Sequence, residues 1–246
     1  MEDQRLLLHK LKDGISLSQK RPWFLGFLSE EEAAVCMDVL KRERDIQYRF
    51  FGGYEEAERK ILGLFPDFLT PEESLFPLTA LTFTYRKEAT LSHRDFLGSF
   101  MALGIERSTV GDILPGQGVC IAFVRAELAD FFKQNLQKIG REGVKISDGL
   151  AAPLPAAHEF ETLSGVIASD RLDCMVAFLC RTGRSKAAEL ISSGLVAKNH
   201  RETLSVSEKL REGDTLSIRK YGKFIIDRFG PLTAKGRLTV QCRKYK

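Results

Sequence analysis

The chain has 246 residues, of which 43% are hydrophobic and 28% are charged, a composition typical of a soluble globular protein with two or three compact units. No apolar run approaches the roughly 20 residues of a membrane-spanning helix, and the N-terminus lacks a secretory signal, so we expect a cytoplasmic protein with no membrane partner. The five cysteines have neither disulfide-framework nor zinc-site spacing. The sequence therefore predicts no disulfide scaffold, no metal and no cofactor.

The net charge of +4 is divided unevenly along the chain. Residues 165–246 hold 17 Lys and Arg against 8 Asp and Glu, whereas residues 1–164 hold 20 against 25. A basic C-terminal part attached to a mildly acidic body indicates a polyanionic partner for that part. Charge alone leaves RNA, DNA and an anionic membrane surface as alternatives.

Residues 1–74 are expected to form an N-terminal, mainly helical α/β domain. Ser29, with Glu32 at the third position after it, is a capping box that predicts the start of a helix. Residues 46–51 alternate as in a strand, and residues 54–62 are expected to form a second helix.

Residues 75–164 are expected to form a central RRM-like (ferredoxin-like) domain in an α+β protein. The periodicity predicts two helices, at 92–103 and 128–139, and strands at 78–85, 119–124, 144–146 and 160–163. The segment 149–157 is expected to be a loop inside this domain rather than a linker. An RRM that stacks bases needs exposed aromatic residues on its strands. Phe83 and Tyr85 are candidates, although Phe83 could equally belong to the core, so an RNA surface and a protein-docking scaffold both stay open.

Residues 165–246 are expected to form a basic C-terminal module. The pattern predicts helices at 169–179 and 184–193, a turn at 198–201 and a strand at 215–220. The order RLD, RSKAAELISSGLV, an Asn-containing turn and GDTLSIRK resembles the RNA-binding domain named after ribosomal protein S-four, over about residues 169–225. The resemblance implies two short helices (the αL motif) with a small sheet. The family turn reads Val-Asn-Gly, and the sequence Lys198-Asn199-His200 can form it if Asn199 takes the left-handed conformation.

The resemblance places RNA contacts on the two helices and the turn. The first turn of the second helix exposes N–H groups that favour phosphate, so Arg184 and Lys186 rank first. The full set of expected RNA contacts is Arg171, Arg181, Arg184, Ser185, Lys186, Lys198, Asn199 and Arg201. A solvated basic helix face is the alternative, and Arg171 could instead form a local pair with Asp173.

The upstream residues narrow the resemblance to one family. The segments FGGYEEAER (51–59), SHRDFLG (92–98), LGIER (103–107) and GDI (111–113) resemble the bacterial YlmH family over nearly the whole chain. That resemblance implies a monomer that binds rRNA of the large ribosomal subunit, with tRNA left open, during ribosome-associated quality control of a stalled peptidyl-tRNA. It also explains an older cell-division label, since family members lie near cell-division genes.

The sequence predicts no enzyme. His93-Arg94-Asp95 matches the start of the kinase catalytic loop, but Phe100 stands where that motif needs Asn. The four histidines lie in four separate segments, without a catalytic constellation. Arg94 and Arg107 are expected to offer secondary contacts to RNA or a partner. The alternatives are an RNA-modifying enzyme of the pseudouridine-synthase type, a DNA-binding regulator and a cell-division scaffold.

Overall fold

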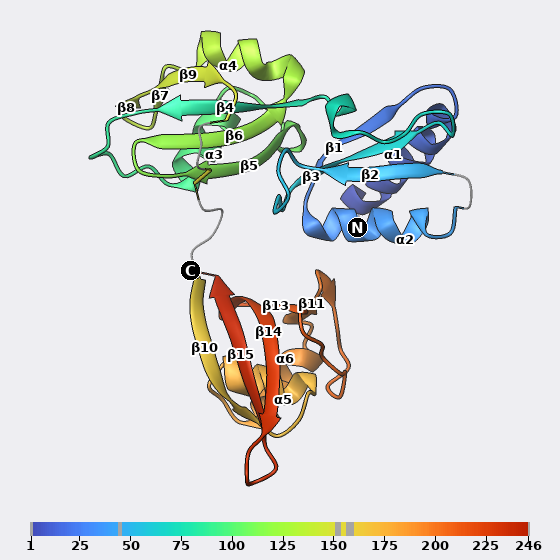
Figure 1. Ribbon diagram of the computed structural model, residues 1–246, viewed down its shortest axis with the longest axis vertical. Helices are drawn as coiled ribbons and strands as arrows, with labels where there is room; N and C mark the ends of the chain where they lie inside the picture. The colour runs from blue at the N-terminus through green and yellow to red at the C-terminus, as the bar shows by residue number, and fades with distance from the viewer. Residues whose placement is uncertain (1, 44–45, 151–153, 156–159, 246) are drawn as a thin grey trace. The chain divides into compact units, whose positions relative to one another are not determined.

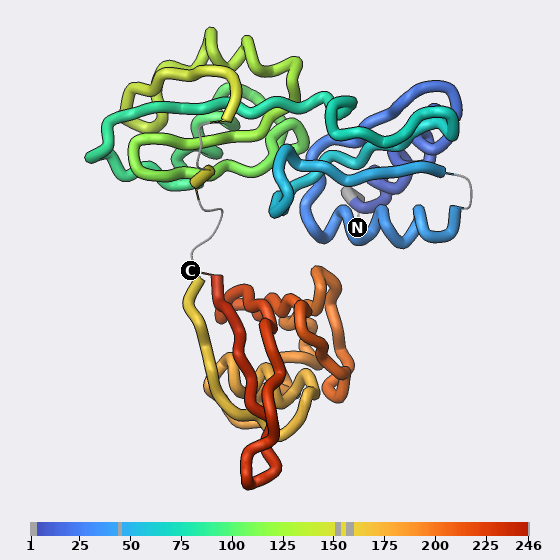
Figure 2. The backbone as a smooth tube through the Cα atoms, in the orientation of Figure 1, coloured from blue at the N-terminus to red at the C-terminus, as the bar shows by residue number. Residues whose placement is uncertain are grey.

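The computed structural model describes residues 2–43, 46–150, 154–155 and 160–245. The protein is a mixed α/β chain with antiparallel sheets, divided into two compact units at residues 1–157 and 158–246 (Figures 1 and 2). Three domains were expected. The expected boundary after residue 74 falls inside the first unit, and the expected boundary after residue 164 lies several residues too late.

The first part of the first unit is a three-stranded antiparallel sheet with two helices. Its elements are α1 (Glu2–Ser18), β1 (Trp23–Leu28), α2 (Glu30–Leu40), β2 (Gln47–Phe51) and β3 (Lys60–Phe65), and the strand order is β1-β3-β2. The predicted capping box is present, because Glu32 N donates to Ser29 Oγ at 3.2 Å and Ser29 N donates to Glu32 Oε2 at 2.7 Å. The three strands make this part less helical than expected.

The helix predicted at 54–62 is wrong. Residues 54–59 form turns, and β3 begins at Lys60. Gly53 has φ +100°, and a Cβ atom there would lie 2.2 Å from the Phe123 ring. The N–H groups of Glu58 and Arg59 donate to the carboxylate of Asp112, at 2.7 and 3.0 Å, rather than to a helix. Tertiary contacts therefore override the helix propensity of the three glutamates in this segment.

The second part of the first unit is a four-stranded antiparallel sheet with the strand order β5-β6-β4-β9. Its elements are η1 (Glu73–Leu75), β4 (Leu78–Thr84), α3 (His93–Ala102), η2 (Arg107–Thr109), β5 (Val110–Pro115), β6 (Val119–Arg125), η3 (Ala126–Leu128), α4 (Ala129–Asn135), β7 (Lys138–Ile139), β8 (Glu142–Gly143) and β9 (Lys145–Asp148). Side chains of α3 and α4 share one apolar core with one face of this sheet. The helix predicted at 128–139 is shorter than expected, because β7 pairs with β8.

A shared apolar core joins the two parts of the first unit. Phe27 of β1 and Ile61 of β3 pack in one buried cluster with Ile121 and Phe123 of β6. The ring of Tyr54 stacks on the ring of Phe123, with the centroids 5.1 Å apart. This cluster covers the face of the β5-β6-β4-β9 sheet that α3 and α4 leave open.

The second unit is a six-stranded antiparallel sheet with the strand order β10-β15-β14-β13-β11-β12. Its elements are β10 (Phe160–Ile167), α5 (Leu172–Leu179), α6 (Arg184–Ser192), β11 (Val196–Lys198), β12 (Arg201–Glu202), β13 (Thr215–Ile218), β14 (Gly222–Leu232) and β15 (Leu238–Tyr245). Both helices lie on one side of the sheet (Figure 1), where residues such as Met175, Ile191 and Phe224 form a buried core.

The strand predicted at 160–163 belongs to this second sheet and not to the central one. Phe160 pairs with Tyr245, and the pairing continues to Ile167 opposite Leu238. Since β9 lies in the first unit and β10 in the second, the segment 149–157 connects the two units and is no loop within one sheet. Residues 151–153 and 156–157 of this segment lie outside the described residues.

Candidate nucleic-acid interface

Helices α5 and α6 meet at a corner where two candidate residues, Arg171 and Arg184, come together. Arg171 is the N-cap residue of α5, and Arg184 is the first residue of α6. The α6 helix begins after Gly183, which has no side chain to cap the first N–H groups. Those N–H groups and the positive end of the helix dipole favour an anion at this position.

A buried carboxylate holds the two arginines together. Asp173, on the first turn of α5, has a side chain that is 5% exposed. Arg171 Nε donates to Asp173 Oδ1 at 3.0 Å, and Arg184 Nη2 donates to Asp173 Oδ2 at 2.6 Å. Burial favours the neutral acid, but the hydrogen bonds and charges of both arginines outweigh it and lower the pKa of Asp173 to about 2. One carboxylate thus fixes two guanidinium groups and neutralises only one of their charges.

This geometry confirms the alternative of a local pair between Arg171 and Asp173, and it adds Arg184 to that pair. The pair does not withdraw the arginines from solvent, since their side chains remain 39% and 58% exposed. Each guanidinium group therefore presents free N–H donors beside the start of α6. The corner is preorganised, so little side-chain entropy is lost when it meets an anion.

Three further candidates surround this corner. Arg181 and Ser185 are exposed, and Arg181 has φ 51° in the turn between the helices. Lys186 is 54% exposed and forms a surface ion pair with Glu189 at 2.9 Å. Surface pairs of this kind contribute about 1 kcal/mol or less, so Lys186 can exchange Glu189 for a phosphate group.

The turn at 198–201 has the geometry that the sequence requires. Asn199 has φ 47°, as expected, and His200 has φ 65°. Asn199 Nδ2 donates to Asp214 Oδ1 at 2.8 Å, and Asn199 Oδ1 accepts from Thr215 N at 2.9 Å. Both ends of the Asn199 side chain therefore hold the turn on β13. Arg201 follows the turn with an exposed side chain.

Lys198 lies inside this turn rather than on its surface. Its side chain is 16% exposed, and Nζ lies 3.0 Å from Glu208 Oε1 and 3.3 Å from Asp214 Oδ2. Burial disfavours the charged form, yet hydrogen bonds and charges of these carboxylates raise the pKa of Lys198. Lys198, expected to contact RNA, thus pairs with carboxylates of its own chain.

Lys209 was not expected and lies next to the corner. It pairs with Arg171 in an isolated antiparallel bridge, and its side chain is 80% exposed. The loop that carries it is fixed on α5, since Leu172 N donates to Glu208 O at 2.8 Å. No local sequence signal predicts this neighbour, because Arg171 and Lys209 meet only through tertiary folding.

The central sheet offers no aromatic stacking platform at the two expected residues. Phe83 is fully buried and packs against Phe96 and Phe100, so the core alternative is confirmed. Tyr85 is partly buried and donates through its hydroxyl to Gly116 O at 2.6 Å. On the opposite face of the sheet Phe123 is 1% exposed beneath Tyr54.

The two secondary candidates differ in their surroundings. Arg94 is exposed on α3. Arg107 instead donates to Val110 O and Gly111 O, at 2.5 and 3.2 Å. Burial, reinforced by the charge of Arg59, lowers the pKa of Arg107 to about 10. Arg107 is therefore bound to the backbone at the start of β5, and Arg94 is the one of the two that can reach a partner.

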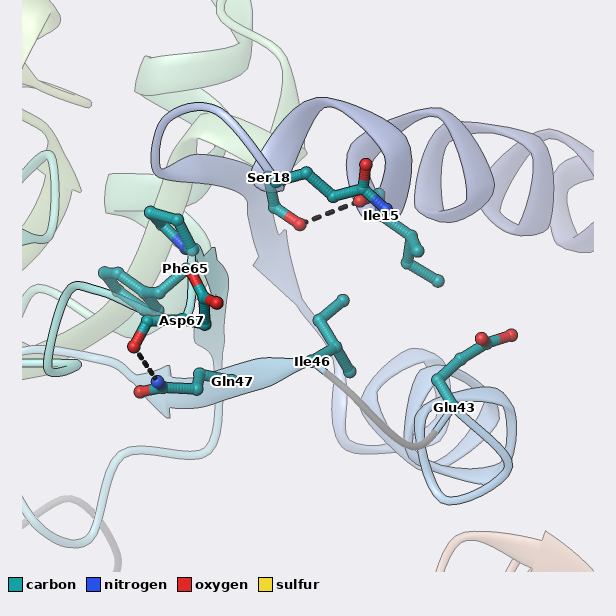
Figure 3. A pocket seen from close by; sticks show the side chains of 9 residues that line it. Ile15, Ser18, Glu43, Ile46, Gln47, Phe65 and Asp67 are labelled. Carbon is teal, nitrogen blue, oxygen red and sulfur yellow. Dashed lines mark hydrogen bonds between the residues drawn. The ribbon is translucent and has the colours of Figure 1, made fainter.

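A hollow of about 780 Å³ opens in the first unit beside α1 and β2 (Figure 3). Ser18 Oγ donates to Ile15 O at 2.9 Å, and Gln47 Nε2 donates to Asp67 O at 2.8 Å. The side chains of Ser18 and Gln47 in the hollow thus bond to the chain itself.

Among residues 2–43, 46–150, 154–155 and 160–245, no three His, Cys, Asp or Glu residues gather as a metal site would require. Within those same ranges, no helix has both the length and the apolar character needed to cross a membrane.

Comparisons with known proteins agree over most of the chain. Residues 71–150 match the family described as "Putative RNA-binding domain in YlmH". Over 231 residues the chain is 33% identical to the Ribosome-associated protein quality control protein P2 of Bacillus subtilis, which covers 93% of this chain and 89% of that protein. The solved structure of Cell division protein ylmH from Streptococcus pneumoniae is similar with a TM-score of 0.53 and 21% identity, over 60% of this chain and 92% of that one. At that identity the similarity concerns the fold alone.

Proposed function

The chain belongs to the YlmH family, and we propose that it is a non-catalytic protein that docks on structured RNA of the large ribosomal subunit. The observation that carries the proposal is the corner at which Asp173 holds Arg171 and Arg184 beside the uncapped start of α6. A rigid cationic corner suits A-form RNA, which proteins recognise by shape, phosphates and 2′-hydroxyl groups. Arg181, Lys186, Arg201 and Lys209 extend the cationic surface around it.

The architecture supports the same proposal. The central sheet has the strand order β9-β4-β6-β5. Numbered by their position in the chain, these are the fourth, first, third and second strands, which is the order of a ferredoxin-like, RRM-like domain. In the second unit, two short helices followed by the Asn199 turn and β13 fit an S-four-type domain. The match of residues 71–150 to an RNA-binding family favours a second contact in the first unit. We assign that contact to the α3 side, at Arg94, because the other face of the sheet is covered.

The name of the Bacillus subtilis relative supports a role in ribosome-associated quality control. We therefore propose that the RNA partner is the large subunit that carries a stalled peptidyl-tRNA, and that the protein acts there as a cytoplasmic monomer. The buried carboxylates of Asp112, Asp173 and Asp214 all accept structural hydrogen bonds. Such roles favour a binding function over an acid–base site.

The test is co-sedimentation with purified large ribosomal subunits, with and without bound tRNA, at increasing salt. Small subunits serve as the control. We expect binding to the large subunit at low salt, with log affinity falling by about 0.7 to 0.9 per log unit of salt for each phosphate contact. A protein that leaves large subunits unbound at low salt, with or without tRNA, contradicts the proposal.

A further inference from the structure

The sheet of the second unit has a face that its two helices do not cover. On β14 and β15, Phe224, Ile226, Val240 and Cys242 point into the core beneath α5 and α6. Because strand residues alternate between faces, the residues between them lie on the opposite side. Figure 1 shows both helices behind the sheet, with β10, β15 and β14 in front of them.

Four residues form a compact cluster on this opposite side, which we call the aromatic–cation face: Phe160, Lys223, Arg243 and Tyr245. The rings of Phe160 and Tyr245 are cross-strand partners, 4.8 Å apart and inclined at 67°. Lys223 Nζ lies 4.6 Å from the centroid of the Tyr245 ring, and Arg243 Cζ lies 4.8 Å from that of the Phe160 ring. Each aromatic ring is thus paired with a cation.

The cluster remains open to solvent. All four residues are partly exposed, and the side chain of Arg243 is 43% exposed although it also binds Asp227 at 2.8 Å. Arg228, exposed, lies on the same face one register position further, opposite Gln241. Among the described residues of this face, the cations Lys223, Arg228 and Arg243 outnumber the carboxylate of Asp227.

Paired rings and cations on an open sheet match the chemistry of a single-stranded nucleic acid. Bases stack on aromatic rings and on guanidinium planes, while phosphates bind neighbouring cations. We propose that the aromatic–cation face is a second RNA-binding surface of this protein, which takes single-stranded RNA. It lies across the sheet from the corner between α5 and α6, so the two surfaces can be tested separately.

The experiment measures the affinity of the full-length chain for a fluorescein-labelled oligouridylate of about twelve nucleotides, a length within the range of single-strand sites. Phe160→Leu with Tyr245→Leu removes both rings and keeps apolar cover. Since each lost base stack weakens binding by about fivefold or more, we expect a loss of at least about fivefold. Lys223→Gln with Arg243→Gln should flatten the salt slope by about 1.4. Ser164→Ala with Gln241→Ala, cross-strand partners on the same face, is the control that should bind like the wild type.

Two further measurements separate this surface from the corner and from misfolding. Arg184→Ala with Lys186→Ala should weaken oligouridylate binding less than the ring variant does, whereas it should weaken large-subunit binding more. Photocrosslinking of wild-type protein to 4-thiouridine-substituted oligomers needs no variant and should label peptides from β10, β14 and β15. Crosslinks confined to other segments, or folded ring and cation variants that bind like the wild type, overturn the proposal and leave this face to a protein partner.

Discussion

Arg184, the first residue of α6, donates to the carboxylate of Asp173 on α5 with Nη2 and Oδ2 2.6 Å apart. The same carboxylate accepts from Arg171 at 3.0 Å. Two cations that repel each other are thus held at one place by a single buried anion. The proposed RNA-binding corner depends on this anion as much as on the arginines.

The Asp173 ion pairs should make the stability of the second unit pH-dependent. The pKa of the Asp173 carboxyl is about 2 in the folded protein and about 3.9 in an unfolded chain. A lowered folded pKa stabilises the fold above the unfolded value, and this contribution is lost as the pH falls from about 4 to 2. Because solvent screens both arginines, we expect about 1–2 kcal/mol.

At neutral pH, Asp173→Asn should lower the free energy of unfolding by that amount. Near pH 2, variant and wild type should have the same free energy of unfolding. Urea unfolding followed by circular dichroism measures both proteins. Fluorescence of Trp23, the single tryptophan of the chain, reports the first unit and identifies its transition. Equal stability of variant and wild type at neutral pH contradicts this account.

Substitutions of Lys198 and of Arg201, three residues apart, should have opposite effects on stability and RNA affinity. Lys198→Met leaves the carboxylates of Glu208 and Asp214 without their shared cation, so we expect a loss of about 1–3 kcal/mol. Arg201→Ala removes an exposed side chain, and since surface contacts of an exposed arginine contribute about 1 kcal/mol or less, it should change stability little and should lower RNA affinity. Denaturation and subunit binding, measured on both variants, separate the two roles. A destabilised Arg201 variant, or a stable Lys198 variant with weakened binding, reverses the assignment.

The second unit should fold alone, and it should be more stable when it includes all of β10. A fragment of residues 158–246 keeps every pair between β10 and β15, whereas a fragment of residues 165–246 begins inside that strand. We expect a cooperative thermal transition for the longer fragment and a lower midpoint for the shorter one. Circular dichroism melts compare them, and identical midpoints would show that the start of β10 does not stabilise the unit.

Asp112 should be the most sensitive polar residue of the first unit. It is 9% exposed and accepts from Tyr54 Oη at 2.8 Å and from two backbone N–H groups. Asp112→Ala leaves these donors unpaired, so we expect a loss of about 2–4 kcal/mol, and Tyr54→Phe should cost about 1 kcal/mol. Trp23 fluorescence in urea measures both. Asp130→Ala, at an exposed position, is the matched control. An Asp112 variant as stable as this control would show that the hydrogen bonds to Asp112 do not stabilise the first unit.

Local signals in the sequence predicted much of the fold. The Ser29 capping box, the strand predicted at residues 78–85 (β4, Leu78–Thr84) and the start of α6 at Arg184 are confirmed, because each depends on neighbours within a few residues. The helix predicted at residues 54–62 was wrong because Asp112, far along the chain, accepts hydrogen bonds from N–H groups of this segment. Residues 160–163 were placed in the wrong sheet, since strand pairing across the chain leaves no mark in local periodicity.

The candidate site shows the same division. The sequence predicted that Arg171 and Arg184 share one region, and the structure confirms it. The turn at 198–201 required a left-handed Asn199, and the structure meets this condition. It could not show that Lys198 is enclosed by Glu208 and Asp214, or that Lys209 lies beside Arg171. A lysine has the same charge in a buried network as on an open surface, and only the fold distinguishes the two.

The affinity of Arg184→Ala with Lys186→Ala for large ribosomal subunits, measured across a salt series, tests the central claim most directly. Arg171 still pairs with Asp173 in this variant, so circular dichroism melts should show a folded protein, and Glu202→Gln in the same unit is the control. We expect most binding to be lost and the salt slope to flatten by about 1.4 to 1.8, as two direct phosphate contacts require. Wild-type affinity with an unchanged slope would show that RNA does not bind at the start of α6.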